Sequence, residues 1–342
     1  MSRHLKPLAT AAGIIALSVL YGFYWNYLSG QIRTGVEQWA AERQADGYTV
    51  AYTGLRIGGF PFRLDAVMTD PEMSALGKDG SWSWRGPALL MRVRPWRPSK
   101  VKVLAAGLHM VRAEKGARSV ELFIDARDLW MTLRFKDRAM LSVRDLLVKD
   151  GTDRDVIKIA AADVVVKRPD KADSVFDVVA NVLGVTYGVE PVRGLGLNSK
   201  QLGLHALVMG TFPDVPARQS LNAETMVQWR DSGGAVEFSR LDIRHGPLAL
   251  SGDGTMALDE GLQPIGSFAI RVGGYDDVLD SLAAAGVIKA RPAAMVKAAL
   301  SVLARTQTSD GGPEIKVPLS LQDRRVYVGP LAVGKVPNLR WP

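Results

Sequence analysis

The residues best suited to chemistry in this chain are cations, and they are concentrated in one segment. Residues 80–113 contain Lys, Arg and Trp side chains but no Asp or Glu. The candidate anion-binding residues in this segment are Arg85, Arg92, Arg94, Arg97, Lys100 and Lys102. Because guanidinium and ammonium groups pair with phosphate, these residues predict a surface for anionic phospholipid or for lipopolysaccharide. The alternative interpretation is a solvated strand face, with Met91 and Val93 on the dry side of the same strand.

The sequence offers little to hold a metal or a cofactor. It contains no Cys, which excludes disulfides, Cys-ligated zinc, iron–sulfur clusters and thiol nucleophiles. The four histidines, which are far apart in sequence, are His4, His109, His205 and His245. The chain also lacks a Walker loop, a dinucleotide fingerprint and a nucleophile elbow. We therefore expect no metal, no cofactor and no enzymatic activity.

The first element that the sequence predicts is an uncharged segment near the amino terminus. Leu8–Leu28 carries no charge, and its 21 residues extend about 31 Å as a helix, which matches a bilayer core. The segment ends in an aromatic cluster typical of a membrane interface. Because Arg3 and Lys6 precede it, we expect residues 1–30 to form a cytoplasmic tip and a transmembrane signal-anchor. A cleaved secretory signal is the alternative, and either interpretation exports the remaining residues to the periplasm.

The segment that follows the anchor changes period at Gly47. Residues 31–47 place Ile32, Val36, Trp39 and Ala40 at helical spacing and predict a short juxtamembrane helix. From residue 48 to residue 342 apolar and polar residues mostly alternate, which predicts strands with one dry face and one wet face. Turn clusters at short intervals, among them Gly252-Asp253-Gly254, predict antiparallel neighbours.

Two later segments depart from the simple strand pattern. Residues 276–306 predict a pair of helices, Asp276–Ala285 and Arg291–Thr306, within the exported body. Residues 172–184 satisfy both the helical and the strand period. The predicted fold class is therefore mainly β: a transmembrane helix, then a long, curved, mostly antiparallel sheet that forms a groove or a sandwich, with a late helical pair.

A short motif resembles a known family. Gly59-Phe60-Pro61-Phe62-Arg63 is similar to a signature of domain-of-unknown-function family 2125, a group of Gram-negative envelope proteins. The single amino-terminal span and Trp82-Ser83-Trp84 also resemble that family, and the likeness covers nearly the whole chain. It implies a structural role for the motif and brings no catalytic residues. More loosely, the architecture is similar to AsmA-like envelope proteins, which implies an apolar groove and a part in lipid movement.

These observations predict an inner-membrane-anchored periplasmic protein that binds apolar lipid or lipoprotein chains in envelope maintenance or lipid transport. The expected partners are the membrane, phospholipid or lipopolysaccharide, and other envelope proteins, whereas an exported body leaves no role for nucleic acid. One alternative is a scaffolding envelope protein with a closed β core. A second is an envelope hydrolase, which requires distant acids such as Asp65, Asp125 and Asp163 to converge.

Overall fold

The computed structural model describes residues 5–77, 80–135, 137–168, 174–211, 222–291, 294, 297, 306–307, 313–329 and 331–341. Within these ranges only the backbone of residues 5–12, 106, 174, 175, 313, 331 and 333 is described. The fold is mainly β with antiparallel strand pairing, as predicted. Contacts divide the chain into two compact units, Met1–Phe135 (unit 1) and Lys136–Pro342 (unit 2), and each is described by itself.

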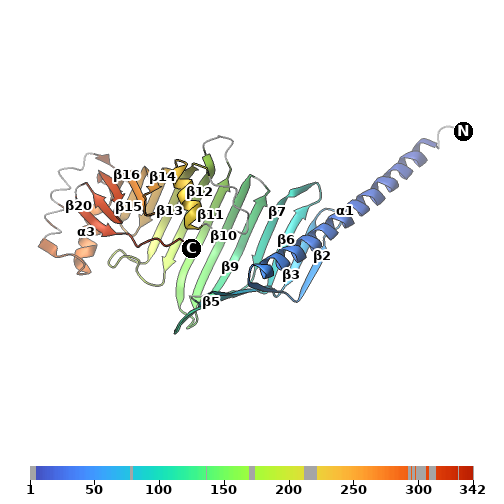
Figure 1. Ribbon diagram of the computed structural model, residues 1–342, viewed down its shortest axis with the longest axis horizontal. Helices are drawn as coiled ribbons and strands as arrows, with labels where there is room; N and C mark the ends of the chain where they lie inside the picture. Colours follow the sequence, from blue (N-terminus) through green and yellow to red (C-terminus); the bar gives the residue numbers. More distant parts are fainter. Residues whose placement is uncertain are drawn as a thin grey trace. The chain divides into compact units, whose positions relative to one another are not determined.

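The first element of unit 1 is one uninterrupted helix, α1 (Leu5–Ala45) (Figure 1). Its carboxyl-terminal half packs on the sheet through a stripe at helical spacing, since Val36 and Ala40 are buried and Trp25, Leu28 and Ile32 contact the core. Trp39, expected on this stripe, is instead 44% exposed. Among the residues described, no helix is both long enough and apolar enough to cross a membrane. The expected span, residues 8–28, begins among side chains that lie outside the described part.

The strands of unit 1 form two leaves joined by one long strand. The strands are β1 (Tyr48–Ala51), β2 (Gly54–Gly58), β3 (Leu64–Thr69), β4 (Glu72–Gly77), β5 (Gly80–Arg85), β6 (Ala88–Arg94), β7 (Arg97–Ala106), β8 (His109–Lys115) and β9 (Arg118–Arg134). Leaf A has the order β2-β3-β6-β7, and leaf B has the order β1-β4-β5-β8. The carboxyl-terminal part of β9 pairs with β7 and its amino-terminal part pairs with β8.

The two leaves separate where successive strands are interrupted by Pro or Gly. Asp70-Pro71 lies between β3 and β4, and Gly86-Pro87 lies between β5 and β6. Pro has no backbone N–H, so it cannot continue a ladder of hydrogen bonds. Gly107, between β7 and β8, has a φ of +83°, a conformation that favours glycine. Figure 1 shows β5 running away from β6 and β7.

Unit 2 is a meander of antiparallel strands with short helices. Its strands are β10 (Arg138–Asp150), β11 (Asp155–Lys167), β12 (Ser174–Tyr187), β13 (Asn198–Met209), β14 (Ala235–His245), β15 (Leu248–Leu258), β16 (Pro264–Gly273), β17 (Thr306–Gln307), β18 (Pro313–Gln322), β19 (Arg325–Val328) and β20 (Leu331–Lys335). Consecutive strands from β10 to β16 pair with each other, β16 pairs with β18, and β18, β19 and β20 follow in order. This confirms the predicted antiparallel neighbours.

The helices of unit 2 only partly match the prediction. α3 (Tyr275–Ala284) confirms the first late helix, whereas most of the second, Arg291–Thr306, lies outside the described residues. α2 (Ala223–Asp231) was not predicted. It is capped by Asn222, whose side chain accepts a hydrogen bond from the Thr225 N–H. The ambiguous segment, residues 172–184, lies largely in β12.

The predicted turn at Gly252-Asp253-Gly254 is wrong, because these residues lie inside β15. The strand carries glycine there for reasons of packing. A Cβ on Gly254 would overlap the ring of Phe268 on the neighbouring strand, and a Cβ on Gly252 would lie 2.7 Å from the Cδ1 of Ile270. Glycine is therefore needed for close packing on one face of the sheet, not for a turn.

Candidate functional site

A basic depression in leaf A brings together five of the six predicted cations. It has a volume of about 320 Å³ and is lined by Arg92, Arg94, Arg97, Lys100, Lys102 and Trp130. The sixth predicted cation, Arg85, lies on β5 of leaf B, where its Nη2 is 3.0 Å from Glu72 Oε2. Trp130 comes from the distant strand β9, and its place in the site was not predicted from the sequence.

Strand register explains why these cations share one face. Arg92 of β6 is opposite Lys102 of β7, and Lys102 is opposite Thr132 of β9. Successive side chains of a strand point to opposite faces, so Val93 and Val101 lie on the other side, in the core that packs against α1. The strand with one dry and one wet face is therefore confirmed, and its wet face is the wall of the depression.

The cations of the depression differ in their partners. Arg92 is held by Asp65 of β3, with Nε donating to Oδ1 at 2.7 Å and Nη2 donating to Oδ2 at 2.9 Å. This hydrogen bonding to Asp65 raises the pKa of Arg92 above its ordinary value. Lys102 Nζ lies 5.6 Å from the centre of the Trp130 ring, a cation–π contact.

The remaining cations keep their charge available. In the part of the chain that the structure describes, Arg94, Arg97 and Lys100 make no ion pair with a carboxylate. The depression therefore has one cation fixed by Asp65, one fixed over an aromatic ring and three free to bind an anion. Its guanidinium and ammonium donors suit phosphate oxygens.

The motif Gly59-Phe60-Pro61-Phe62-Arg63 forms the loop between β2 and β3 and contacts α1. The Tyr21 hydroxyl donates to the Pro61 carbonyl, and Trp25 Nε1 donates to the Arg63 carbonyl at 3.0 Å. The rings of Trp25 and Phe60 meet edge to face, with centroids 5.6 Å apart. The motif therefore docks the helix on leaf A, in keeping with the structural role that the resemblance implied.

A family model described as an uncharacterized protein conserved in bacteria (DUF2125) matches residues 25–337, nearly the whole chain. The chain belongs to this family. No curated protein and no solved structure matches the chain. The matched residues of this DUF2125 member include the motif, the basic depression and most of each unit, so the predicted resemblance is confirmed. The family description states no activity.

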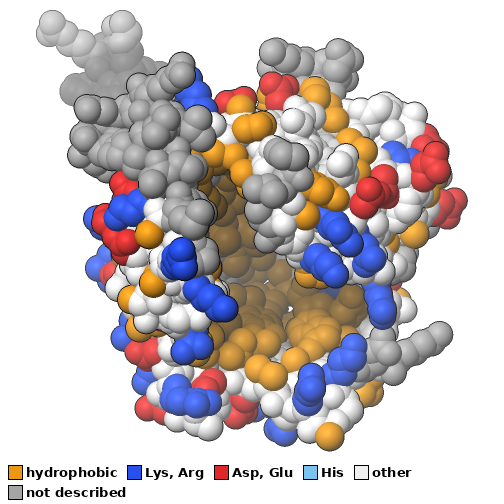
Figure 2. Space-filling model, turned by 90° about the vertical axis from the view of Figure 1, so that its left-hand side faces the viewer, with side chains coloured by type: hydrophobic (Ala, Val, Ile, Leu, Met, Phe, Trp, Pro, Cys, Tyr) orange, Lys and Arg blue, Asp and Glu red, His pale blue; other side chains and the backbone are white. Residues whose placement is uncertain are grey.

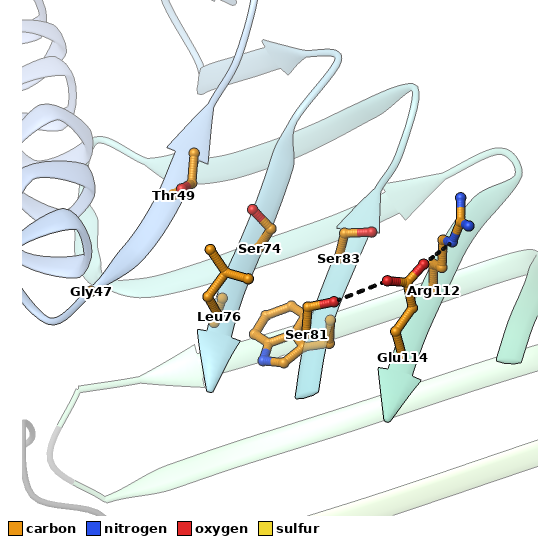
Figure 3. A pocket seen from close by; sticks show the side chains of 10 residues that line it. Gly47, Thr49, Ser74, Leu76, Ser81, Ser83, Arg112 and Glu114 are labelled. Carbon is orange, nitrogen blue, oxygen red and sulfur yellow. Dashed lines mark hydrogen bonds and ion pairs between the residues drawn. The ribbon is translucent and has the colours of Figure 1, made fainter. Parts of the chain in front are cut away.

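A second depression of this DUF2125 member, of about 320 Å³, lies on leaf B (Figure 3). Its polar lining includes Thr49, Ser74, Ser81, Ser83, Arg112 and Glu114. Arg112 Nε lies 3.0 Å from Glu114 Oε1, and the Ser81 hydroxyl lies 3.5 Å from Glu114 Oε2. The Glu114 carboxylate is already paired with Arg112, so the hydroxyl groups of this depression are suited to binding hydrogen-bonding ligands.

Two of the three acids considered for a hydrolase, Asp65 and Asp163, have structural partners. Asp65 pairs with Arg92, and Asp163 of β11 accepts hydrogen bonds from Arg144 at 2.9 Å and from Ser142 at 2.7 Å. Burial alone would raise the pKa of Asp163, but these hydrogen bonds outweigh it and the pKa is lowered. Asp125 is exposed on β9.

Three of the four histidines have structural surroundings, and His4 lies outside the described residues. His205 Nε2 lies 3.0 Å from Asp177 Oδ1, and His245 Nδ1 lies 2.9 Å from the hydroxyl of Ser199 in a buried position. His109 is buried against Trp84. Among the described residues, no group of three or more His, Asp or Glu side chains could hold a metal ion.

Unit 2 carries an apolar face that the predicted alternation had indicated only strand by strand. Register aligns apolar residues across seven strands, from β11 to β16 and then β18. One such row is Ala162, Val182, Leu202, Ile243, Leu250, Val272 and Ile315. A second row is Val164, Ala180, Leu204, Leu241, Gly252, Ile270 and Val317, and a third is Val166, Val178, Ala206, Phe238, Gly254, Phe268 and Leu319.

Most side chains of this apolar face are only half-buried, and Ile243 is 38% exposed. In the view toward β16 and β20, Figure 2 shows a hollow lined by hydrophobic side chains, with Lys and Arg side chains at its mouth. The opposite face of the same strands is polar and holds ion pairs such as Arg144 with Asp163 and Arg240 with Asp242. Unit 2 therefore has one solvated face and one apolar face, and most side chains of the apolar face are only partly buried.

Proposed function

We propose that this DUF2125 member is an inner-membrane protein, held by a single amino-terminal anchor, whose periplasmic β body binds the apolar chains of lipids or lipoproteins. Its role is envelope maintenance or lipid transport, and it needs no catalysis. The observation that carries this proposal is the apolar face of unit 2. Three apolar rows that cross seven strands are far larger than an isolated exposed residue, and extended exposed apolar surface usually marks a binding site.

The membrane part of the proposal rests on the sequence of α1. Residues 8–28 carry no charge, basic residues precede them and aromatic residues end them. Exposure of the described side chains supports it, because Ile14, Leu17, Leu20 and Phe23 are each at least 63% exposed. Such a surface on a helix is stable in lipid and costly in water.

Site-specific photocrosslinking in cells tests lipid binding directly. The photoreactive residue p-benzoylphenylalanine replaces Ile243, which lies on the apolar face of β14. The matched control places it at Asp253, which is exposed on the polar face of the neighbouring strand β15. We expect lipid adducts, identified by mass spectrometry of the purified chain, at position 243 and none at position 253.

Two outcomes count against lipid binding. Crosslinks from position 243 that reach only protein, or only this chain itself, favour the scaffolding alternative with its apolar face closed by protein. Equal lipid labelling at positions 243 and 253 shows that labelling reflects membrane proximity rather than a binding face. Either result removes the apolar face as a lipid site.

A further inference from the structure

Two hairpin loops of leaf A contact α1 at the point where the helix leaves the sheet. The β2–β3 loop is tied to the helix by the bonds from Tyr21 to Pro61 and from Trp25 to Arg63. The β6–β7 loop is tied to the same turns, because the Tyr24 hydroxyl donates to the Pro95 carbonyl at 2.9 Å. Three hydrogen-bonding aromatic residues, Tyr21, Tyr24 and Trp25, lie within about one helical turn and fix both loops at one level along the helix axis.

The tips of these loops expose large apolar rings to their surroundings. The exposed fractions are 58% for Phe60, 72% for Phe62 and 55% for Trp96. We call these three residues the aromatic tips. Local contacts hold both loops in place. Pro95, beside Trp96, is fully buried, and the Arg63 N–H donates to the Gly59 carbonyl at 3.0 Å.

The aromatic tips continue an exposed apolar surface on α1. Every residue from 13 to 20 is exposed, and among the described side chains of α1 the Tyr21 hydroxyl makes a hydrogen bond to a loop of the sheet. The exposed apolar side chains of the helix therefore lead to the loop tips, and the three loop carbonyls that accept hydrogen bonds from the helix, those of Pro61, Arg63 and Pro95, are satisfied there.

Cations flank the aromatic tips. The Arg63 side chain is 56% exposed beside Phe62, and Arg94 and Arg97 lie opposite each other at the base of the turn that carries Trp96. Exposed aromatic rings next to Arg and Lys are the composition that settles at the boundary between acyl chains and anionic headgroups. Binding to a protein would not explain why cations surround an apolar patch that continues into a helix long enough to span a bilayer.

We propose that the aromatic tips insert into the interfacial layer of an anionic phospholipid bilayer, around the point where α1 enters it. This proposal rests on the membrane anchor of the proposed function and adds a second point of attachment. It also assigns the basic depression its ligand, because Arg94 and Arg97 belong to both surfaces. With the tips inserted, Arg94 and Arg97, which flank the turn that carries Trp96, lie within reach of the phosphate groups of the same leaflet.

The absence of Cys from the chain makes the proposal directly testable. Single cysteines are introduced by the substitutions Phe62→Cys and Trp96→Cys in the full chain and labelled with a nitroxide. Each protein is reconstituted in nanodiscs of phosphatidylethanolamine and phosphatidylglycerol. The accessibility of each label to oxygen and to a water-soluble nickel complex then reports its depth in the bilayer.

Two control positions on α1 set the scale. Leu17→Cys reports whether the helix is in the bilayer, and Trp39→Cys reports a position that is 44% exposed and lies about 21 Å along the helix from Trp25. We expect labels at positions 17, 62 and 96 to favour oxygen, with position 17 the deepest, and the label at position 39 to favour the nickel complex.

The outcomes separate this proposal from the anchor on which it rests. A label that is deep at position 17 while positions 62 and 96 are as accessible to nickel as position 39 overturns the insertion of the tips and leaves the anchor intact. A label at position 17 that is accessible to nickel overturns both. Protection of positions 62 and 96 from both reagents shows that a protein surface covers the tips, and it also overturns their insertion.

Discussion

The indole of Trp84 and the imidazole of His109 are stacked, with ring centroids 5.7 Å apart and planes only 10° from parallel. Trp84 belongs to β5 and His109 opens β8, so this pair lies in leaf B next to the point where the two leaves separate. His109 is only 4% exposed. A titratable ring is thus buried in leaf B.

Acid pH should destabilise unit 1 through this ring. Burial lowers the pKa of His109 below its ordinary value of 6.5, and the backbone of Ala105 and the carboxylate of Asp125 only partly oppose this. Because the unfolded chain binds this proton more readily, stability is complete above pH 6.5 and decreases as the pH falls below it. We expect the melting temperature to fall between pH 7.5 and pH 5.5, and to fall less in His109→Phe, which keeps the stacked ring. An unchanged pH dependence in that variant would falsify the role of His109.

The substitution Gly86→Ala should be strongly destabilising for a related reason. A Cβ at position 86 would overlap Nδ1 of His109, which the stack on Trp84 prevents from moving away. We expect a loss of about 2 kcal/mol or more in the free energy of unfolding, measured by denaturant titration. Gly58→Ala is the control, because nothing lies within 4 Å of its Cβ position. If the double variant Gly86→Ala/His109→Ala is no more stable than Gly86→Ala, the overlap is not the cause.

Much of this fold was predictable because a strand's alternation is local. The segments 129–135 and 157–161 show it clearly, and both lie mainly in strands. The separation of unit 1 into leaves was not predicted, although Asp70-Pro71 and Gly86-Pro87 signal it. A Pro between two short apolar runs is typical both of a turn and of a break within one continuing strand, and only the pairing partners distinguish the two.

The candidate site was predictable in composition but not in its electrostatics. The cations of β6 and β7 are close in sequence, so their clustering follows from one hairpin. Asp65 and Trp130 come from strands far away in the sequence, and they decide which cations are already paired. The apolar face of unit 2 likewise depends on the register of seven strands, which no single strand's pattern contains.

Removal of the Asp65 carboxylate should destabilise the fold more than removal of an exposed carboxylate. Asp65→Asn leaves Arg92 and Arg63 without their shared carboxylate, whose side chain is 16% exposed. We expect a loss of about 1–2 kcal/mol in stability, between the values for exposed and buried ion pairs. Glu72→Gln, which removes the exposed partner of Arg85, should cost about 0.5 kcal/mol or less. Denaturant titrations of both variants give the comparison, and equal losses would contradict it.

The lysines of the basic depression should set a preference for anionic lipid. Lys100→Gln/Lys102→Gln removes two positive charges from its wall, each worth about 1 kcal/mol near an anionic surface. We expect the preference of the detergent-solubilised chain for phosphatidylglycerol over phosphatidylethanolamine, measured by native mass spectrometry, to fall about tenfold or more. Lys115→Gln/Arg118→Gln, which removes two exposed cations at the turn between β8 and β9, serves as the control with the same change in net charge. An equal fall in both variants would show that only net charge matters.

The docking of α1 on the family motif should depend on one indole N–H. Trp25→Phe keeps a ring against Phe60 but removes the donor to the Arg63 carbonyl. Since a hydrogen bond of this kind contributes about 1 kcal/mol, opening of the β2–β3 loop should become about fivefold more frequent. Hydrogen exchange at the Arg63 amide, which donates to the Gly59 carbonyl, measures that opening.

Trp39→Phe is the matched control, because this exposed indole lies on the same helix and has no part in the loop. Exchange at the Arg63 amide should be unchanged in that variant. Unchanged exchange in Trp25→Phe as well would mean that the loop is held by its own backbone and by Tyr21 alone. The loop would then be an independent hairpin, and the aromatic tips would not be fixed in depth by the helix.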